Sequence, residues 1–135
     1  MNLQRLHRWV GIVTVIVFLL TGLYMRWWFP DLYQADETIR SLFRANHIYL
    51  LLAGLLNLGL GLYLTEQAER WRRMLQRTGS VLLLAAPVVL LAAFFYEPPQ
   101  ATPERPVTVL GVFFLLIGTL CHYIATFRRS DHRAA

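Results

Sequence analysis

The sequence contains no lysine, only one cysteine and few charged residues of any kind. Only 16% of its 135 residues are charged, against about 25% in an average soluble domain, whereas 56% are hydrophobic. A soluble chain of this length could not bury so much apolar surface, because small domains leave much of their surface in water. The lone cysteine, Cys121, cannot form an internal disulfide, and we interpret it as a small buried hydrophobe. The composition therefore predicts contact with lipid.

Enzyme motifs are also missing from the sequence. It has no metal-spaced Cys/His set, no phosphate loop, no H-E-x-x-H and no nucleophile elbow. The uninterrupted apolar runs, 9–29, 48–64, 81–96 and 107–127, contain no Asp or Glu, which argues against a proton- or cation-coupled transporter. The net charge of +5 is carried entirely by arginine and lies at the ends of the apolar runs rather than in one patch. Nucleic acid is therefore not expected as a partner.

What the sequence does contain is four apolar runs, each long enough to cross a membrane as a helix of roughly 20 residues. The predicted spans are about 9–29, 46–65, 78–97 and 107–127. The connections between them are short, so neighbouring helices must run antiparallel. Pro87 lies in the middle of the third run and is expected to kink it. The sequence thus predicts an all-α polytopic membrane protein, with residues 1–135 forming one antiparallel four-transmembrane-helix bundle.

Arginines are distributed unequally between the two sides of the predicted bundle. One side has nine, at positions 5, 8, 70, 72, 73, 77, 128, 129 and 133, and the other has four, at positions 26, 40, 44 and 105. The positive-inside rule places the arginine-rich side in the cytoplasm. Both termini are then predicted to be cytoplasmic.

Charge spacing and proline predict the structure of the connections. Acidic and basic residues three and four apart, from Asp36 to Arg44, predict an outward extension of the second helix. The pairs Glu66–Arg70 and Glu69–Arg73 predict an interfacial helix before the third span. The proline-rich segment 97–106 predicts a turn without helix.

Small and polar residues recur at helical spacing on three of the four runs. The stripes are His7, Gly11, Thr14, Phe18, Thr21 and Met25; His47, Gly54, Leu58, Gly61 and Thr65, with Asn57 slightly to one side; and Thr108, Gly111, Leu115, Gly118 and His122. The third run has no comparable stripe. Such stripes are typical of close helix packing in lipid, and each of these three includes a histidine. The other interpretation of these stripes is that their glycines make room for a flat haem ring held between histidines.

Histidines within membrane spans are candidates for function, because ionisable groups are rare there. The candidate cofactor ligands are His122, His7 and His47, with haem b as the possible cofactor; the sequence leaves the identity of any bound metal open. His7 and His122 are predicted near the same side, but at depths that differ by roughly 10 Å on straight helices. His47 lies at the opposite side, where Met25 is its only candidate thioether partner. His122 as a packing residue, bonded to a threonine or a backbone carbonyl, is the alternative.

The first run resembles a known family in two short segments. LHRWVG at positions 6–11 and LTG at positions 20–22 are similar to the first helix of PepSY-associated transmembrane proteins. The resemblance covers about 20 of the 135 residues and does not include a PepSY domain. It implies a protein of the bacterial cytoplasmic (inner) membrane, sometimes tied to iron or reductase functions, and no site residue is carried over from it.

Two functional classes fit these observations. The first is a small, non-enzymatic inner-membrane protein whose partners are the lipid bilayer and either other membrane subunits or further copies of itself. It follows from stripes suited to packing and from the missing reactive motifs. The second is a membrane b-type haem or quinone-linked electron-transfer protein that uses histidines near the helix ends. The sequence favours the first class, and the colour of the purified protein distinguishes them.

Overall fold

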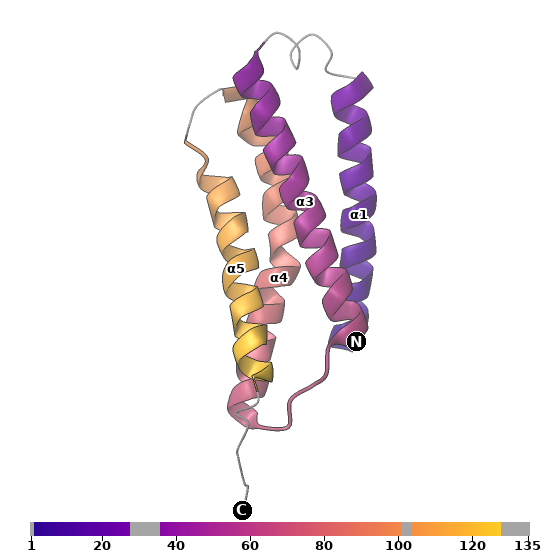
Figure 1. Ribbon diagram of the computed structural model, residues 1–135, viewed down its shortest axis with the longest axis vertical. Helices are drawn as coiled ribbons and strands as arrows, with labels where there is room; N and C mark the ends of the chain where they lie inside the picture. The colour runs from indigo at the N-terminus through magenta and orange to yellow at the C-terminus, as the bar shows by residue number, and fades with distance from the viewer. Residues whose placement is uncertain (1, 28–35, 101–103, 128–135) are drawn as a thin grey trace, which may run out of the picture.

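The computed structural model describes residues 2–27, 36–100 and 104–127 as a bundle of four long helices (Figure 1). The helices are α1 (Leu3–Trp27), α3 (Glu37–Tyr63), α4 (Arg70–Tyr96) and α5 (Pro106–Thr126), with a short 3-10 turn η1 (Pro98–Gln100) between the last two. The described part of the chain contains no strand. All four helices are long and apolar enough to cross a membrane. The predicted fold class, an all-α bundle of four transmembrane helices, is confirmed.

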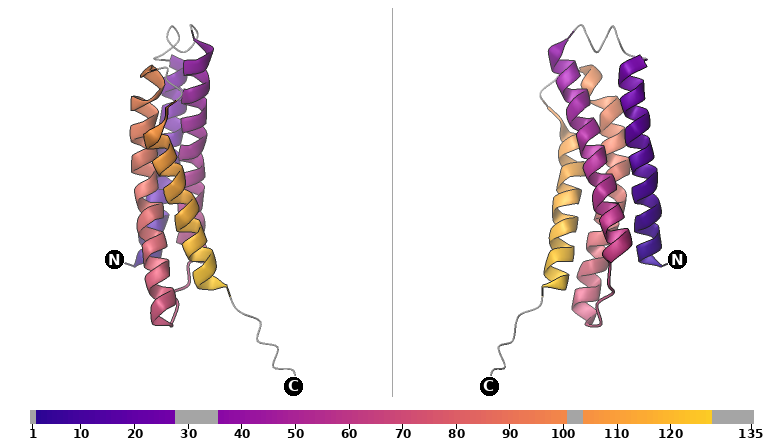
Figure 2. Two further views of the ribbon diagram at one scale, coloured as in Figure 1. Left: turned by 90° about the vertical axis from the view of Figure 1, so that its left-hand side faces the viewer. Right: turned by 45° about the vertical axis from the view of Figure 1, so that its right-hand side comes forward.

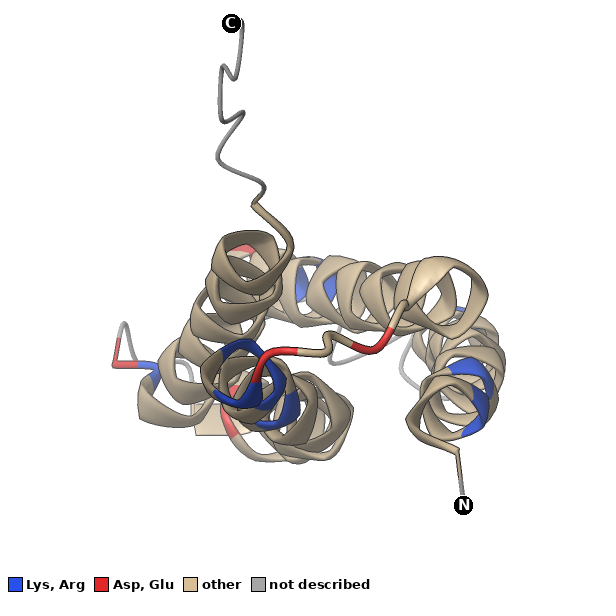
Figure 3. Ribbon diagram, turned by 90° about the horizontal axis from the view of Figure 1, so that it is seen from below, with Lys and Arg blue, Asp and Glu red and all other residues tan. Residues whose placement is uncertain are grey.

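The helices run antiparallel along the long axis of the molecule (Figure 2). We call the end where α1 begins and α5 ends the terminal end, and the opposite end the loop end (Figure 1). Viewed from the terminal end, blue arginine segments mark the starts of α1 and α4 (Figure 3). Of the nine arginines predicted on this side, Arg128, Arg129 and Arg133 lie outside the described residues.

Four details differ from the prediction: one helix start, one interfacial helix, one ion pair and one turn. Helix α1 begins at Leu3, six residues before its apolar run, because the polar residues there lie in its first turns. The interfacial helix predicted around Glu66 is wrong: α3 ends at Tyr63 and the next helix starts only at Arg70. Glu69 pairs with Arg72 at 2.9 Å instead of with Arg73. The turn after α4 is not free of helix, since it contains η1.

The predicted extension of the second helix before its apolar run is confirmed, and a side chain fixes its start. Helix α3 begins at Glu37 with Asp36 as its N-cap. The Asp36 carboxylate accepts hydrogen bonds from the backbone N–H groups of Thr38 (2.7 Å) and Ile39 (3.4 Å). Acidic side chains are favoured at this position, because the first N–H groups of a helix have no partner within it.

Glycines bring α1 against α3 and α4 against α5. A side chain on Gly61 would place its Cβ 2.6 Å from the Cα of Arg8, and one on Gly11 would lie 2.6 Å from the backbone nitrogen of Leu58. Between α4 and α5, a Cβ on Gly118 would lie 2.6 Å from the Cγ of Leu83 and 2.9 Å from the carbonyl oxygen of Gly79. These stripes therefore pack inside the protein.

Helix α4 also has a buried face that the sequence did not reveal. Its members recur at helical spacing and include small and polar residues: Gln76, Gly79, Ser80, Leu83, Ala86, Pro87, Leu90, Ala93 and Phe94. The helix continues through Pro87. This face carries Ser80, which lies within hydrogen-bond distance of the candidate histidine His122.

Candidate functional site

His7 of α1 and His122 of α5 meet inside the bundle. Their ring centroids are 6.1 Å apart and the rings are nearly perpendicular, at 82°. The exposed fractions are 0% for His7 and 7% for His122, so both rings are shielded by protein. The predicted depth difference of roughly 10 Å between them is wrong, because α1 already starts at Leu3 and carries His7 within its helix. The two histidines form one site.

Asn57 of α3 fixes the orientation and the tautomer of His7. The amide nitrogen of Asn57 donates to the carbonyl oxygens of Ala53 (2.9 Å) and Leu83 (2.8 Å). Its Oδ1 therefore faces His7 Nδ1, at 2.7 Å. An amide oxygen only accepts, so Nδ1 must carry the hydrogen and Nε2 the lone pair. Within the described residues, that buried Nε2 has no hydrogen-bond partner.

Pro87 explains why the Leu83 carbonyl is available to Asn57. In a regular helix this oxygen would accept a hydrogen bond from the N–H four residues later. Position 87 is proline, whose ring nitrogen carries no hydrogen. Asn57 replaces the missing donor and connects α3 to α4. The position of the His7 ring thus depends on a proline in another helix.

Ser80 of α4 is the hydrogen-bond partner of His122. Its hydroxyl lies 3.0 Å from His122 Nε2, and both groups are buried. The other ring nitrogen, Nδ1, is buried without a hydrogen-bond partner in the described part of the chain. The alternative partners expected from the sequence, a threonine or a backbone carbonyl, are replaced by this serine. Each histidine is therefore held by one nitrogen and leaves the other unused.

Space adjoins His122 on the side of α3 and α5, two helices that make few contacts with each other. A cavity of about 320 Å³ lies between these helices, with His122 in a wall formed mainly by leucines. Gly59 also lines it, and a side chain there would meet nothing within 4 Å. The cavity is apolar apart from His122, Thr119 and the edge of Tyr63. A flat apolar group in this cavity would lie against His122, whereas His7 is not among the residues that line it.

His47 lies in the loop-end half of the bundle, away from this pair. Its Nδ1 is 3.0 Å from the hydroxyl of Thr21, and its ring stacks on Phe18 with a centroid distance of 4.0 Å. Met25, its candidate thioether partner, packs against the hydrophobic core. The structure gives His47 a packing role between α1 and α3.

A buried polar network at the loop end was not predicted from the sequence. The Glu97 carboxylate accepts from the backbone N–H groups of Val107 (2.7 Å) and Thr108 (3.1 Å), at the start of α5. Arg105 and Asn46 complete the network, with Arg105 donating to the Asn46 side-chain oxygen. Glu97 thus compensates the partial positive charge of a helix start. The signal in the sequence that could have revealed this network is the position of Glu97 directly after an apolar run.

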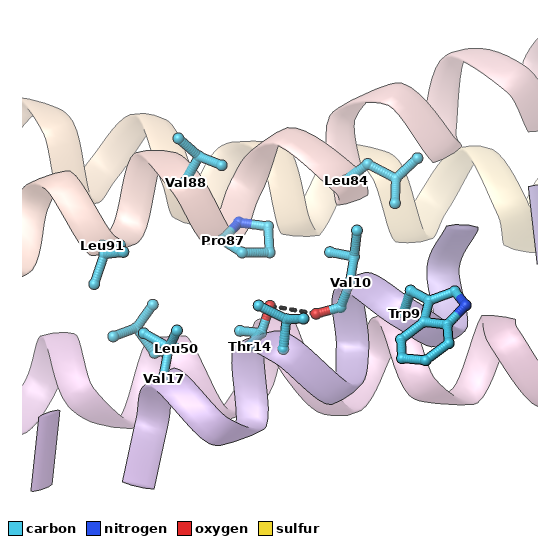
Figure 4. Close-up of a pocket in the computed structure, with 10 residues that line it drawn as sticks. Trp9, Val10, Thr14, Val17, Leu50, Leu84, Pro87, Val88 and Leu91 are labelled. Carbon is cyan, nitrogen blue, oxygen red and sulfur yellow. Dashed lines mark hydrogen bonds between the residues drawn. The ribbon is translucent and has the colours of Figure 1, made fainter. Parts of the chain in front are cut away.

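A second cavity, about 290 Å³, lies between α1 and α4 (Figure 4). Its walls are apolar, and the Thr14 hydroxyl in it donates to the carbonyl oxygen of Val10 at 2.7 Å (Figure 4). The Thr14 hydroxyl is therefore satisfied within its own helix. We assign no binding or catalytic function to this cavity.

No family model matches the chain, and neither a curated protein nor a solved structure is similar to it. The residues themselves must therefore support any functional assignment. Among the residues described, no group of three or more His, Cys, Asp or Glu side chains could hold a metal ion.

Proposed function

We propose that this protein is a small membrane b-type cytochrome, with His7 and His122 as the axial ligands of one haem and electron transfer as its function. The observation that supports it is the 6.1 Å separation of two buried imidazoles, each with an unused nitrogen. Metal–nitrogen bonds of about 2 Å on either side place two donor nitrogens roughly 4 Å apart and their ring centroids roughly 6 Å apart. The pair has that spacing.

The number of ligands favours haem over a bare ion. Structural zinc sites use about four protein ligands, whereas the described residues offer only the two histidines here. A porphyrin supplies four equatorial nitrogens and needs only axial ligands from the protein. The cavity beside His122, where Gly59 leaves open space, provides room for part of a flat ring.

The surroundings of the histidines also suit metal ligation. Ligating histidines almost always donate their second nitrogen to an oxygen, which fixes the ring. Asn57 accepts such a bond from His7, and Ser80 is within hydrogen-bond distance of His122. His7 and His122 would together hold the haem iron, which would then leave no position for a substrate. This arrangement favours electron transfer over oxygen chemistry.

The proposed location is the bacterial inner membrane, with the terminal end in the cytoplasm. The positive-inside rule supports this orientation, since the sequence predicts nine of the thirteen arginines on that side. The haem would then lie in the cytoplasmic half of the membrane. The resemblance of the first helix to PepSY-associated proteins is consistent with this location.

Spectra of three histidine variants test the proposal. The wild-type protein, produced with haem available, should have a Soret band and sharp α and β bands on reduction. His7→Gln and His122→Gln should each lose the low-spin spectrum, because an amide is a poor iron ligand. His47→Gln is the matched control and should keep it, since His47 only packs against Phe18 and Thr21.

A well-folded wild-type protein that stays colourless would refute the proposal. That result would favour the accessory or self-associating membrane protein, which the packing stripes and the missing enzyme motifs of the sequence support. Haem retained in both His7→Gln and His122→Gln would place the cofactor elsewhere and equally contradict the assignment.

A further inference from the structure

A polar cavity of about 360 Å³ opens at the terminal end of the bundle, close to the histidine pair. Gln76 and Arg77 of α4 line it, as does Leu3 of α1. Leu3 lies four residues before His7, and Gln76 lies four residues before Ser80, the partner of His122. Residues four apart lie on the same face of a helix, one turn or about 6 Å along its axis. The cavity is therefore one helical turn from the site, on its terminal side.

The two arginines that line this cavity, Arg73 and Arg77, differ in their hydrogen bonds. Arg73 donates to the carbonyl oxygens of Gln67 (3.1 Å) and Ala68 (2.9 Å), so it holds the connection before α4. Arg77 is exposed and makes no hydrogen bond or ion pair within the described residues. Glu66 also lines the cavity, so its three charged side chains carry a net charge of +1. Arg77 is the cation available to an incoming anion.

Haem is itself asymmetric in charge. Its ring is apolar, but one edge carries two propionate carboxylates, which are anionic at neutral pH. On the loop-end side of the pair the bundle interior is apolar, with Leu50, Ala53 and Leu83 buried. Unpaired carboxylates would be costly there. Close to the pair, the described residues offer a cation and an opening to water on the terminal side alone.

We infer that Arg77 binds a propionate of the haem and so orients the cofactor with its carboxylate edge toward the terminal end. This inference rests on the proposed function. A guanidinium matches a carboxylate in geometry as well as in charge. Arg77 is a positioning residue: it sets which way round the ring enters, whereas the two histidines hold the iron.

Haem dimethyl ester separates this contact from every other contribution to binding, because its carboxylates are neutralised while its ring and iron are unchanged. The affinity of detergent-solubilised apoprotein for haem b and for the ester is measured by optical titration. Arg77→Gln should weaken haem b binding by about tenfold, the expected size for a charge-assisted bond that is partly exposed. It should leave binding of the ester unchanged. Arg70→Gln, an exposed arginine in the same helix that does not line the cavity, should change neither.

Equal weakening of both ligands in Arg77→Gln would overturn the inference, because a general loss of structure or of net charge does not depend on propionates. Unchanged haem b affinity would overturn it as well, while the cytochrome assignment stands on the histidine variants. If the wild-type apoprotein binds neither ligand, the proposed function fails and the inference fails with it. The ester titration therefore distinguishes the two failures.

Discussion

Replacing Asn57 with leucine should destabilise the protein through two groups that the amide now satisfies. The variant leaves the His7 Nδ1–H and the Leu83 carbonyl oxygen buried without their partner. A buried group left unsatisfied costs about 1–3 kcal/mol. Interhelical hydrogen bonds in one membrane protein average only about 0.6 kcal/mol, so we expect a loss near the lower end, about 2 kcal/mol.

The proline makes this prediction specific. In a Pro87→Ala background the new N–H at position 87 can donate to the Leu83 carbonyl within α4. Asn57→Leu should then cost about 1 kcal/mol less than it does in the wild type. The free energy of unfolding of the four proteins in mixed detergent micelles gives the coupling directly. A coupling energy below about 0.3 kcal/mol, which is the error expected for independent sites, would refute the proposed link from Pro87 through Asn57 to His7.

Two further predictions concern the packing of the helices and their orientation. Gly61→Ala should destabilise the bundle by about 1–3 kcal/mol, as overpacking does, because its Cβ would lie 2.6 Å from the Cα of Arg8; Gly59→Ala, with nothing within 4 Å, is the control and should not. Equal effects of the two changes on the unfolding free energy would contradict the packing of α1 on α3. A reporter fused after Ala135 should be active only as a cytoplasmic reporter and one after Gln100 only as a periplasmic one, and the reverse pattern would invert the proposed orientation.

The sequence predicts the fold well because lipid imposes simple requirements. A spanning helix needs about 20 apolar residues, and a hydropathy run reveals them without knowledge of packing. The start of α1 escaped this signal, since Gln4, Arg5 and Arg8 are polar although they belong to the helix. That single boundary produced the wrong depth for His7 and concealed its match with His122.

The histidines themselves were found from the sequence, but their partners were not. Asn57 was only noted beside a stripe, and Ser80 lay in a helix with no recognised stripe. Their roles depend on which helix faces which, and a single sequence does not specify this. Pro87 predicts a free carbonyl at Leu83, yet only the three-dimensional arrangement reveals that Asn57 of another helix occupies it.

The coordination state of iron in the purified protein tests the central claim most directly. Electron paramagnetic resonance of the oxidised wild-type protein, together with its haem content, measures that state. The proposed site predicts one low-spin ferric haem per chain with two imidazole ligands from His7 and His122. A high-spin or substoichiometric haem, or none at all, would contradict it.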